Sequence, residues 1–122
     1  MKKLIIQIFF ISLGLNNTLY VPHDFITIQE AIEASVDNDT IMVSEGEYYE
    51  NINFIGKSII VIGENINNTI IDGSQNSSVV RFENDEDNNS ILDGFSIRNG
   101  KSQYGGGIYL SDASPQIKNI KI

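Results

Sequence analysis

The sequence predicts an all-β fold, a parallel β-helix of which this chain supplies the first few coils. Three observations predict it: many short strands, a weak internal repeat and a single amphipathic helical segment near the amino end. The 122 residues include 22 Ile and 14 Asn but no Cys. Because Ile favours buried, pleated strands and Asn favours tight turns, this composition indicates short strands joined by short turns.

The expected strands are separated by clusters of Gly, Asn, Asp and Ser, which are typical of turns. They lie at residues 40–44, 51–54, 58–62, 69–73, 78–82, 90–97, 107–110 and 116–122. Beyond residue 35 no helical pattern separates them, which excludes alternating βαβ units.

The internal repeat favours a solenoid. The sequence T-I-I-D-G at 69–73 returns as S-I-L-D-G at 90–94, 21 residues later, and F-S-I-R-N at 95–99 has a weaker echo at 117–121. A period of about 20–28 residues is typical of solenoids. Leucine-rich repeats are disfavoured because Leu is scarce. A β-sandwich remains an alternative, since its strands recur at similar spacing.

A short capping helix is expected at about residues 27–35. Thr27 and Glu30 form a capping box, and Ile28, Ala31 and Ile32 share one face. The first coil of a β-helix exposes unpaired backbone and apolar side chains. We therefore expect this helix to cover that end.

The amino end is typical of a secretory signal peptide, predicted at residues 1–19. Lys2 and Lys3 precede an apolar run at 4–11, and Ser12 and Gly14 supply small residues at a cleavage spacing, although cleavage nearer Leu19 is an alternative. The run is shorter than the ~20 residues of a membrane-spanning helix. The sequence thus predicts a secreted or cell-surface protein without a transmembrane span after cleavage, with residues 20–122 forming the amino-terminal part of a β-helix domain.

Charge and composition exclude several function classes. Sixteen acidic residues against eight basic ones give a net charge of −8. Such a chain repels nucleic acid, so no nucleic-acid partner is expected. The absence of Cys and the single His exclude thiolate and multi-histidine metal sites.

The order of several segments resembles the start of the right-handed parallel β-helix, or pectin-lyase-like, superfamily. These segments are residues 24–32, 46–52, 56–59 and 69–73. Residues 92–100 and 105–109 resemble the bacterial secreted and surface branch, in particular the repeats of polymorphic outer-membrane proteins. A weaker similarity joins the helix and residues 46–50 to the start of pectin methylesterases. The resemblance covers roughly residues 20–122 and implies further coils of the same, longer protein beyond Ile122.

The resemblance implies an exported, adhesin-like surface module that binds polysaccharide or a surface protein and is not catalytic by itself. One alternative is the amino-terminal part of a polysaccharide lyase or pectin esterase whose catalytic coils lie beyond Ile122. Another is a purely structural stalk. No catalytic residue is assigned, because the Asp, Gln and Arg motifs of those enzymes do not occur in these residues.

Tyrosines and an arginine are candidates for ligand binding. Tyr48, Tyr49, Tyr104 and Tyr109 could stack on sugar rings, and Arg98 could clamp the carboxylate of an acidic sugar. Tyr104, Tyr109 and Arg98 are the three residues predicted to bind. The alternatives are packing or a partly exposed ladder for the tyrosines, and a surface salt bridge for Arg98.

Four aspartates are candidates for calcium, and no other cofactor is expected. Asp72 and Asp93 take equivalent positions in the repeat, so stacked coils would bring them within a few strand spacings of ~4.8 Å, as calcium ligands or an acid/base pair. Asp85 and Asp87 belong to an acidic turn at 83–89 that offers several oxygen ligands. The alternatives are aspartates that hydrogen-bond their own turns, and a solvated acidic turn.

Overall fold

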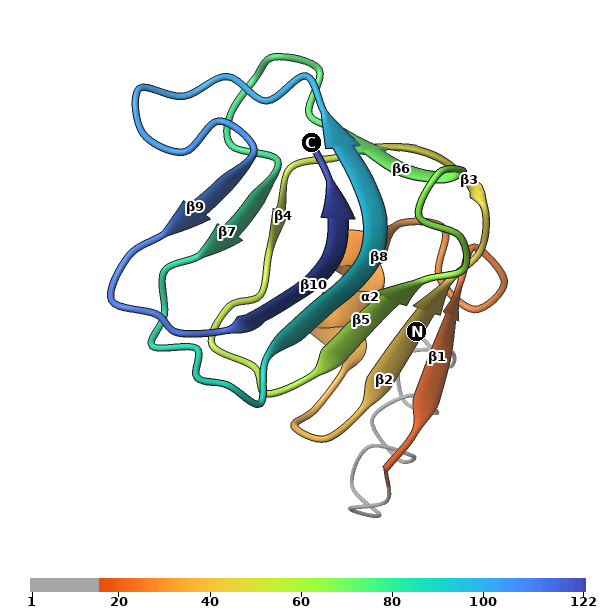
Figure 1. Cartoon of the computed structure of the whole chain (residues 1–122). Coiled ribbons are helices and arrows are strands. Elements are labelled where there is room, and N and C mark those ends of the chain that lie inside the picture. The colour runs from red at the N-terminus through yellow and green to blue at the C-terminus, as the bar shows by residue number, and fades with distance from the viewer. Residues whose placement is uncertain (1–15) are drawn as a thin grey trace.

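The chain forms a parallel β-solenoid of about four turns with one short helix near the amino end (Figure 1). The structure is a computed structural model, and it describes residues 16–122. Every strand pairing among the described residues is parallel, and each pairing joins strands of successive coils. The predicted all-β fold class, with its capping helix, is therefore confirmed.

The strands stack into three faces. Face 1 contains β1 (Thr18–Val21), β2 (Thr40–Val43), β5 (Ile60–Gly63) and the first halves of β8 (Ile91–Arg98) and β10 (Gln116–Lys121). Face 2 contains β3 (Gly46–Tyr49), β6 (Thr69–Asp72) and the second halves of β8 and β10. Face 3 contains β4 (Ile52–Asn53), β7 (Val80–Phe82) and β9 (Ile108–Leu110).

The coils differ in length. Successive register partners on face 1 are Thr18, Thr40, Ile60, Ile91 and Gln116, so the coils contain 22, 20, 31 and 25 residues. The strands keep the same positions within each coil, and the turns between them account for the differences in coil length. A repeat of unequal coils leaves only a weak periodicity in the sequence.

The two motifs that revealed the repeat are not equivalent in the structure, which corrects the sequence alignment. The motif at 69–73 lies on face 2, where Ile70 pairs with Ser96. The motif at 90–94 lies on face 1, where Ile91 pairs with Ile60. Each motif leads to a corner of the coil, but the corners differ: β6 ends after Asp72, whereas β8 bends at Gly94 and continues.

Strand β8 runs through one corner and so serves both faces. Gly94 stands at the bend with a φ of +86°, a left-handed conformation that favours glycine. A Cβ at Gly94 would lie 2.7 Å from the Gly63 carbonyl oxygen of the preceding coil. The corner therefore needs glycine both for its backbone angle and for the close approach of the two coils.

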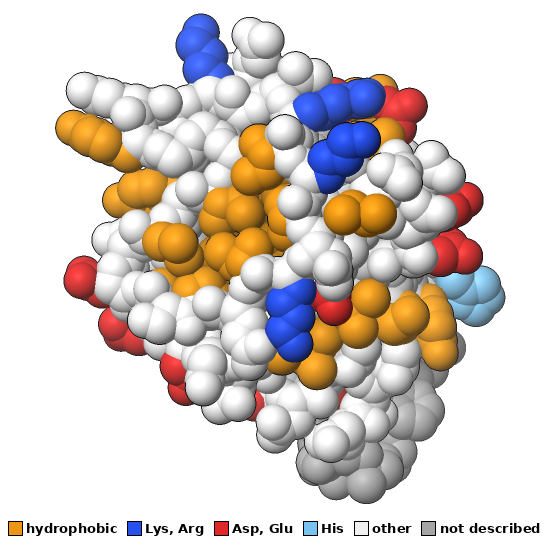
Figure 2. Space-filling view, viewed as in Figure 1, with side chains coloured by type: hydrophobic (Ala, Val, Ile, Leu, Met, Phe, Trp, Pro, Cys, Tyr) orange, Lys and Arg blue, Asp and Glu red, His pale blue; other side chains and the backbone are white. Residues whose placement is uncertain are grey.

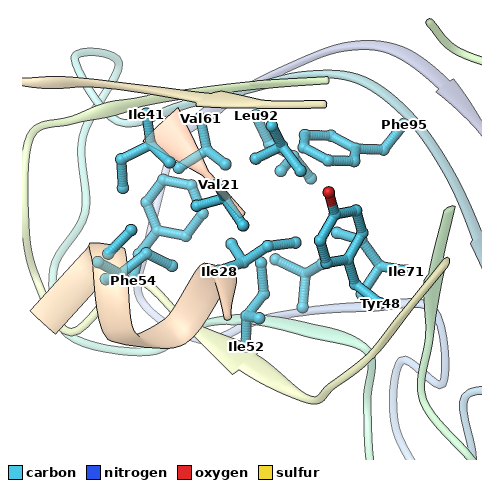
Figure 3. Packing of buried hydrophobic residues seen from close by; sticks show 14 of the residues in the cluster. Val21, Ile28, Ile41, Tyr48, Ile52, Phe54, Val61, Ile71, Leu92 and Phe95 are labelled. Atoms are coloured by element: carbon cyan, nitrogen blue, oxygen red, sulfur yellow. The ribbon is translucent and has the colours of Figure 1, made fainter. Parts of the chain in front are cut away.

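The core consists of stacked columns of aliphatic and aromatic side chains (Figure 3). On face 1 the side chains of Ile41, Val61 and Leu92 are register partners and are fully buried. On the opposite side the rings of Phe54 and Phe82 lie 4.4 Å apart between centroids. Each fully buried side chain of this size contributes about 1.5–3 kcal/mol of burial free energy.

Helix α2 (Ile28–Ala34) lies across the amino-terminal end of the core, and the predicted capping helix is confirmed (Figures 1 and 3). Its buried residues are Ile28, Ala31 and Ile32, as the amphipathic pattern indicates. The Thr27 hydroxyl accepts a hydrogen bond from the Glu30 N–H at 3.1 Å. The same hydroxyl donates to the Glu30 carboxylate at 2.9 Å, so the capping box closes between the two side chains.

Side chains of neighbouring coils form hydrogen bonds with the backbone N–H and carbonyl groups at the two ends of α2. The Glu50 carboxylate accepts the N–H groups of Ile28 and Gln29 at 2.8 and 3.0 Å. At the other end Lys57 Nζ donates to the carbonyls of Ile32, Glu33 and Ser35 at 2.6–2.8 Å. The helix is thus fixed by side chains that are more than twenty residues away in the sequence.

The two ends of the solenoid differ. Helix α2 covers the amino-terminal end, whereas Leu110 and Ile117 of the last coil are 47% and 37% exposed. Figure 2 shows hydrophobic side chains gathered in the region of β9 and β10.

Most of the predicted signal peptide lies outside the described residues. Strand β1 begins at Thr18, so the last two residues of the predicted segment 1–19 belong to the solenoid. Within residues 16–122 the single helix is too short to cross a lipid bilayer.

Candidate ligand-binding site

A cluster of polar side chains lies on the outer surface of face 2. Its members, called the face 2 cluster below, are Glu47, Tyr49, Asp72, Arg98 and Asn99. Tyr49, Asp72 and Arg98 are register partners, so they form one outward column across three consecutive coils. The parallel register alone therefore places an aromatic ring, a carboxylate and a guanidinium side by side.

Asp72 is the centre of this cluster and is only 4% exposed. Its carboxylate accepts hydrogen bonds from Arg98 Nε, Asn99 Nδ2 and the Ser74 N–H, each at 2.9 Å. The Ser74 N–H and then the Arg98 guanidinium hold the pKa of Asp72 below its ordinary value. Asp72 is therefore a carboxylate at neutral pH.

Glu47 joins the arginine to the exposed tyrosine. Its carboxylate accepts a hydrogen bond from the Arg98 guanidinium and another from the Tyr49 hydroxyl at 3.0 Å. The hydrogen bond to Glu47 raises the pKa of Tyr49, so the phenol keeps its proton. The bond to Asp72 likewise raises the pKa of Arg98, whose side chain is 46% exposed.

The cluster offers groups that suit the recognition of a hydroxyl-rich ligand. The Tyr49 side chain is 65% exposed and is held by its hydroxyl, so its ring is a fixed apolar platform. A guanidinium has five N–H donors, and the hydrogen bonds of Arg98 to Asp72 and Glu47 use two of them. Donors and acceptors for ligand hydroxyls thus surround an exposed aromatic ring.

The three predicted ligand-binding residues lie at different places. Arg98 belongs to the face 2 cluster, and its guanidinium holds two carboxylates, which is the salt-bridge alternative. Tyr109 lies on face 3, in register with Arg81. Tyr104 is 66% exposed in the turn between β8 and β9.

The predicted pair of Asp72 and Asp93 is not formed, which corrects the expectation drawn from the repeat. Asp72 is the register partner of Arg98, whereas the register partners of Asp93 are Ile62 and Lys118. Asp93 accepts a hydrogen bond from Asn119 Nδ2 at 2.9 Å. The two carboxylates lie on different faces because their motifs precede different corners.

The acidic turn at 83–89 fastens one coil to the next. Glu86 is buried, and its carboxylate accepts the N–H groups of Gly56 and Asn84 at 2.9 and 2.8 Å. Asp87 accepts the Asn89 N–H at 2.9 Å, and Asp85 is exposed. Among residues 16–122 no three His, Cys, Asp or Glu side chains come together in a way that could hold a metal ion.

Only part of the face 2 cluster can be predicted from the sequence. Glu47 and Tyr49 alternate on one strand, so a shared side could be expected. Their meeting with Asp72 and Arg98 depends on coil lengths that the weak repeat does not reveal. Asn99 has a positive φ of 57° just after β8, and no sequence signal points to it.

Comparison with known proteins adds no relative: no family model, curated protein or solved structure matches the chain.

Proposed function

We propose that this chain is a non-catalytic surface module that binds neutral glycans through the face 2 cluster. The observation that carries the proposal is the exposed Tyr49 ring beside a guanidinium that two carboxylates already neutralise. Sugar rings present apolar C–H faces that stack on such rings and hydroxyls that pair with carboxylate and guanidinium groups. The three coils that build the cluster make it a rigid surface.

Charge favours a neutral glycan over an acidic one. Asp72 and Glu47 together carry one more charge than Arg98 can balance, and the chain as a whole has a net charge of −8. An acidic sugar would have to displace a carboxylate that is already bound to the guanidinium. Neutral hydroxyls can instead use the donors that remain on Arg98.

The protonation states favour binding over catalysis. Acid/base catalysis on a glycosidic bond needs one carboxyl group that keeps its proton near the working pH. The pKa of Asp72 is lowered, and Glu47 accepts from both Arg98 and Tyr49. An arrangement of this kind holds charges in place and provides no protonated carboxyl group.

We further propose that the chain belongs to the bacterial surface branch of the right-handed parallel β-helix superfamily and is exported. The parallel solenoid and its amino-terminal cap support this membership. Lys2, Lys3 and the apolar run after them support export. Because β1 begins at Thr18, cleavage near Gly14 would leave the solenoid whole. Mass spectrometry of the exported protein tests this: a first residue between 15 and 18 is expected, and an uncleaved chain would contradict export by this signal.

The binding proposal is tested by titrating the purified chain with neutral oligosaccharides, such as xylo- and cello-oligosaccharides, and with oligogalacturonate. NMR shift changes are expected for the Tyr49 ring and the Arg98 side chain with a neutral sugar. Tyr49→Ala should weaken binding at least about tenfold, the loss of about 1.4 kcal/mol of stacking free energy. Tyr20→Ala is the matched control, because Tyr20 is 48% exposed but lies on face 1.

Each other outcome separates the alternatives. If no sugar binds, the proposal is wrong and a structural stalk is favoured. If oligogalacturonate is cleaved, the enzyme alternative replaces it. Binding that Tyr20→Ala removes and Tyr49→Ala spares would assign the site to another face.

A further inference from the structure

The sequence contains a single Asn-Gly pair, Asn99 and Gly100, and the fold explains both residues. Asn99 has a φ of +57°, a left-handed conformation that asparagine tolerates better than most residues. A Cβ at Gly100 would overlap the carbonyl oxygen of Gly106, so a larger residue does not fit. The pair directly follows β8, and Asn99 belongs to the face 2 cluster.

An asparagine that precedes glycine can react with its own backbone. The nitrogen of the following residue attacks the side-chain Cγ, and the new bond closes a succinimide ring. Nδ2 leaves as ammonia and takes the proton of the attacking N–H. Water then opens the ring at one of its two carbonyl carbons, which leaves aspartate or isoaspartate in place of asparagine. Glycine favours the attack because it has no side chain that obstructs the approach.

The Gly100 nitrogen is available for this attack. Among residues 16–122 its N–H donates to no backbone or side-chain acceptor. The backbone on both sides is held: the Asn99 carbonyl accepts the Gln75 N–H at 2.7 Å, and the Lys101 N–H donates to the Ser77 carbonyl at 2.9 Å. The side chain of Asn99 is exposed, so water reaches the ring once it has formed.

The amide group that must leave is bound to Asp72. Asn99 Nδ2 donates to the Asp72 carboxylate at 2.9 Å. That carboxylate is 4% exposed and is fixed in turn by Arg98 Nε and the Ser74 N–H. Departure of Nδ2 as ammonia breaks this hydrogen bond. The loss of a hydrogen bond to a charged acceptor is enough to slow the reaction about tenfold.

We propose that Asn99 deamidates spontaneously in the folded chain and that its hydrogen bond to Asp72 sets the rate. The product places a third carboxylate beside those of Asp72 and Glu47, with the Arg98 guanidinium between them. Like charges then repel where a hydrogen bond was present. Isoaspartate also lengthens the main chain by one carbon. Deamidation therefore loosens the face 2 cluster with time, and because it needs no ligand it is independent of glycan binding.

Incubation of the purified chain at mildly alkaline pH, followed by peptide mass spectrometry, tests the proposal. Conversion of Asn99 to aspartate and isoaspartate is expected. Asn119 is an internal control: it has a φ of +48° and its Nδ2 donates to Asp93 at 2.9 Å, but Ile120 follows it. Asn119 should therefore stay intact. An unchanged Asn99 would overturn the proposal, and so would equal conversion at Asn119.

Asp72→Ala tests the role of the hydrogen bond. The substitution removes the acceptor of Nδ2, so Asn99 should convert about tenfold faster than in the wild type. Glu47→Ala is the matched control, because it also takes a carboxylate from Arg98 but leaves the bond between Asn99 and Asp72 in place. Equal rates in the two variants would show that Asp72 does not set the rate.

A second measurement keeps this test decisive if Asp72→Ala does not give the circular dichroism spectrum of the wild type. The wild-type chain unfolded in urea lacks the hydrogen bond, so Asn99 should convert at least about tenfold faster there than in the folded chain. Equal rates in the folded and unfolded chains would overturn the proposal.

Asn99→Asp reproduces the aspartate product and tests its effect on the cluster. The NMR resonance of the Arg98 Nε–H should shift, because the balance of charge around the guanidinium changes. Asn119→Asp makes the same change beside Asp93 and should leave this resonance where it is. An Arg98 resonance that is unchanged in Asn99→Asp would contradict the loosening of the cluster.

Discussion

Among individual residues, buried carboxylates hold the turns of neighbouring coils together. Asp39 accepts the N–H groups of Asn17 and Val36, both at 2.9 Å, and Glu86 does the same for Gly56 and Asn84. Each carboxylate takes one N–H from its own turn and one from the preceding coil. The backbone groups that the ladders leave at the turns are thereby satisfied.

Glu86→Ala tests this role. The substitution leaves the N–H groups of Gly56 and Asn84 without their acceptor in a buried turn, so it should lower the free energy of unfolding by about 1–3 kcal/mol. Urea denaturation measures the change. Glu83→Ala is the control from the same turn, because its exposed ion pair with Arg81 contributes at most about 1 kcal/mol. Equal effects of the two substitutions would contradict a fastening role for Glu86.

The pKa of Asp72 gives a prediction about pH. An acid whose pKa is lowered in the folded state stabilises the fold above its unfolded-state pKa, and this stabilisation is lost as the pH falls through the folded-state pKa. For Asp72 the loss should begin near pH 3.8 and continue below it. Asp72→Asn should therefore be less stable than the wild type at pH 7 and approach it at lower pH.

Thermal unfolding between neutral and strongly acidic pH measures this convergence. Asp93→Asn is the matched control, because Asp93 accepts from Asn119 and lies on another face. A stability difference between Asp72→Asn and wild type that stays constant with pH would contradict the ion-paired state of Asp72.

At the element scale, the corner of β8 and the ends of α2 determine how the coils close. The corner depends on the positive φ of Gly94 and on its contact with Gly63. The helix depends on Glu50 and Lys57 from later coils. Both features tie a local conformation to a neighbouring coil.

Gly94→Ala should destabilise the chain by at least about 1–2 kcal/mol, the cost of a left-handed alanine, before the clash with Gly63 is added. Gly106→Ala is the control, because its nearest contact would be at 3.5 Å and its φ is not in the left-handed region. Denaturation midpoints of the two variants compare them. If both tolerate alanine equally, the bend in β8 is not where the structure places it.

Thr27→Ala should lower the free energy of unfolding by about 1 kcal/mol, because the Glu30 N–H loses its acceptor at the start of α2. Thr27→Ser keeps the hydroxyl and should stay close to the wild type. Urea titration of the two variants gives the difference. An unchanged midpoint for Thr27→Ala would show that Glu50 alone caps the helix.

At the scale of the whole molecule, the sequence predicted the architecture better than the site. Strand composition, turn residues and the capping box each depend on neighbours within a few residues, so they can be predicted from the sequence. The face that a strand joins depends on the lengths of the turns before it. Because the coils vary from 20 to 31 residues, the repeat in the sequence does not show which strands share a face. The repeat therefore pairs Asp72 with Asp93 wrongly, and it does not predict that Tyr49 and Arg98 meet in the same cluster.

The parallel register of the strands brings the members of the face 2 cluster together. A NOESY spectrum of the isotopically labelled chain tests it most directly. We expect cross-strand contacts that link Ile41 to Val61 and Val61 to Leu92, with the backbone pattern of parallel strands. Close contacts between facing α-protons of consecutive strands, the pattern of an antiparallel sandwich, would contradict it.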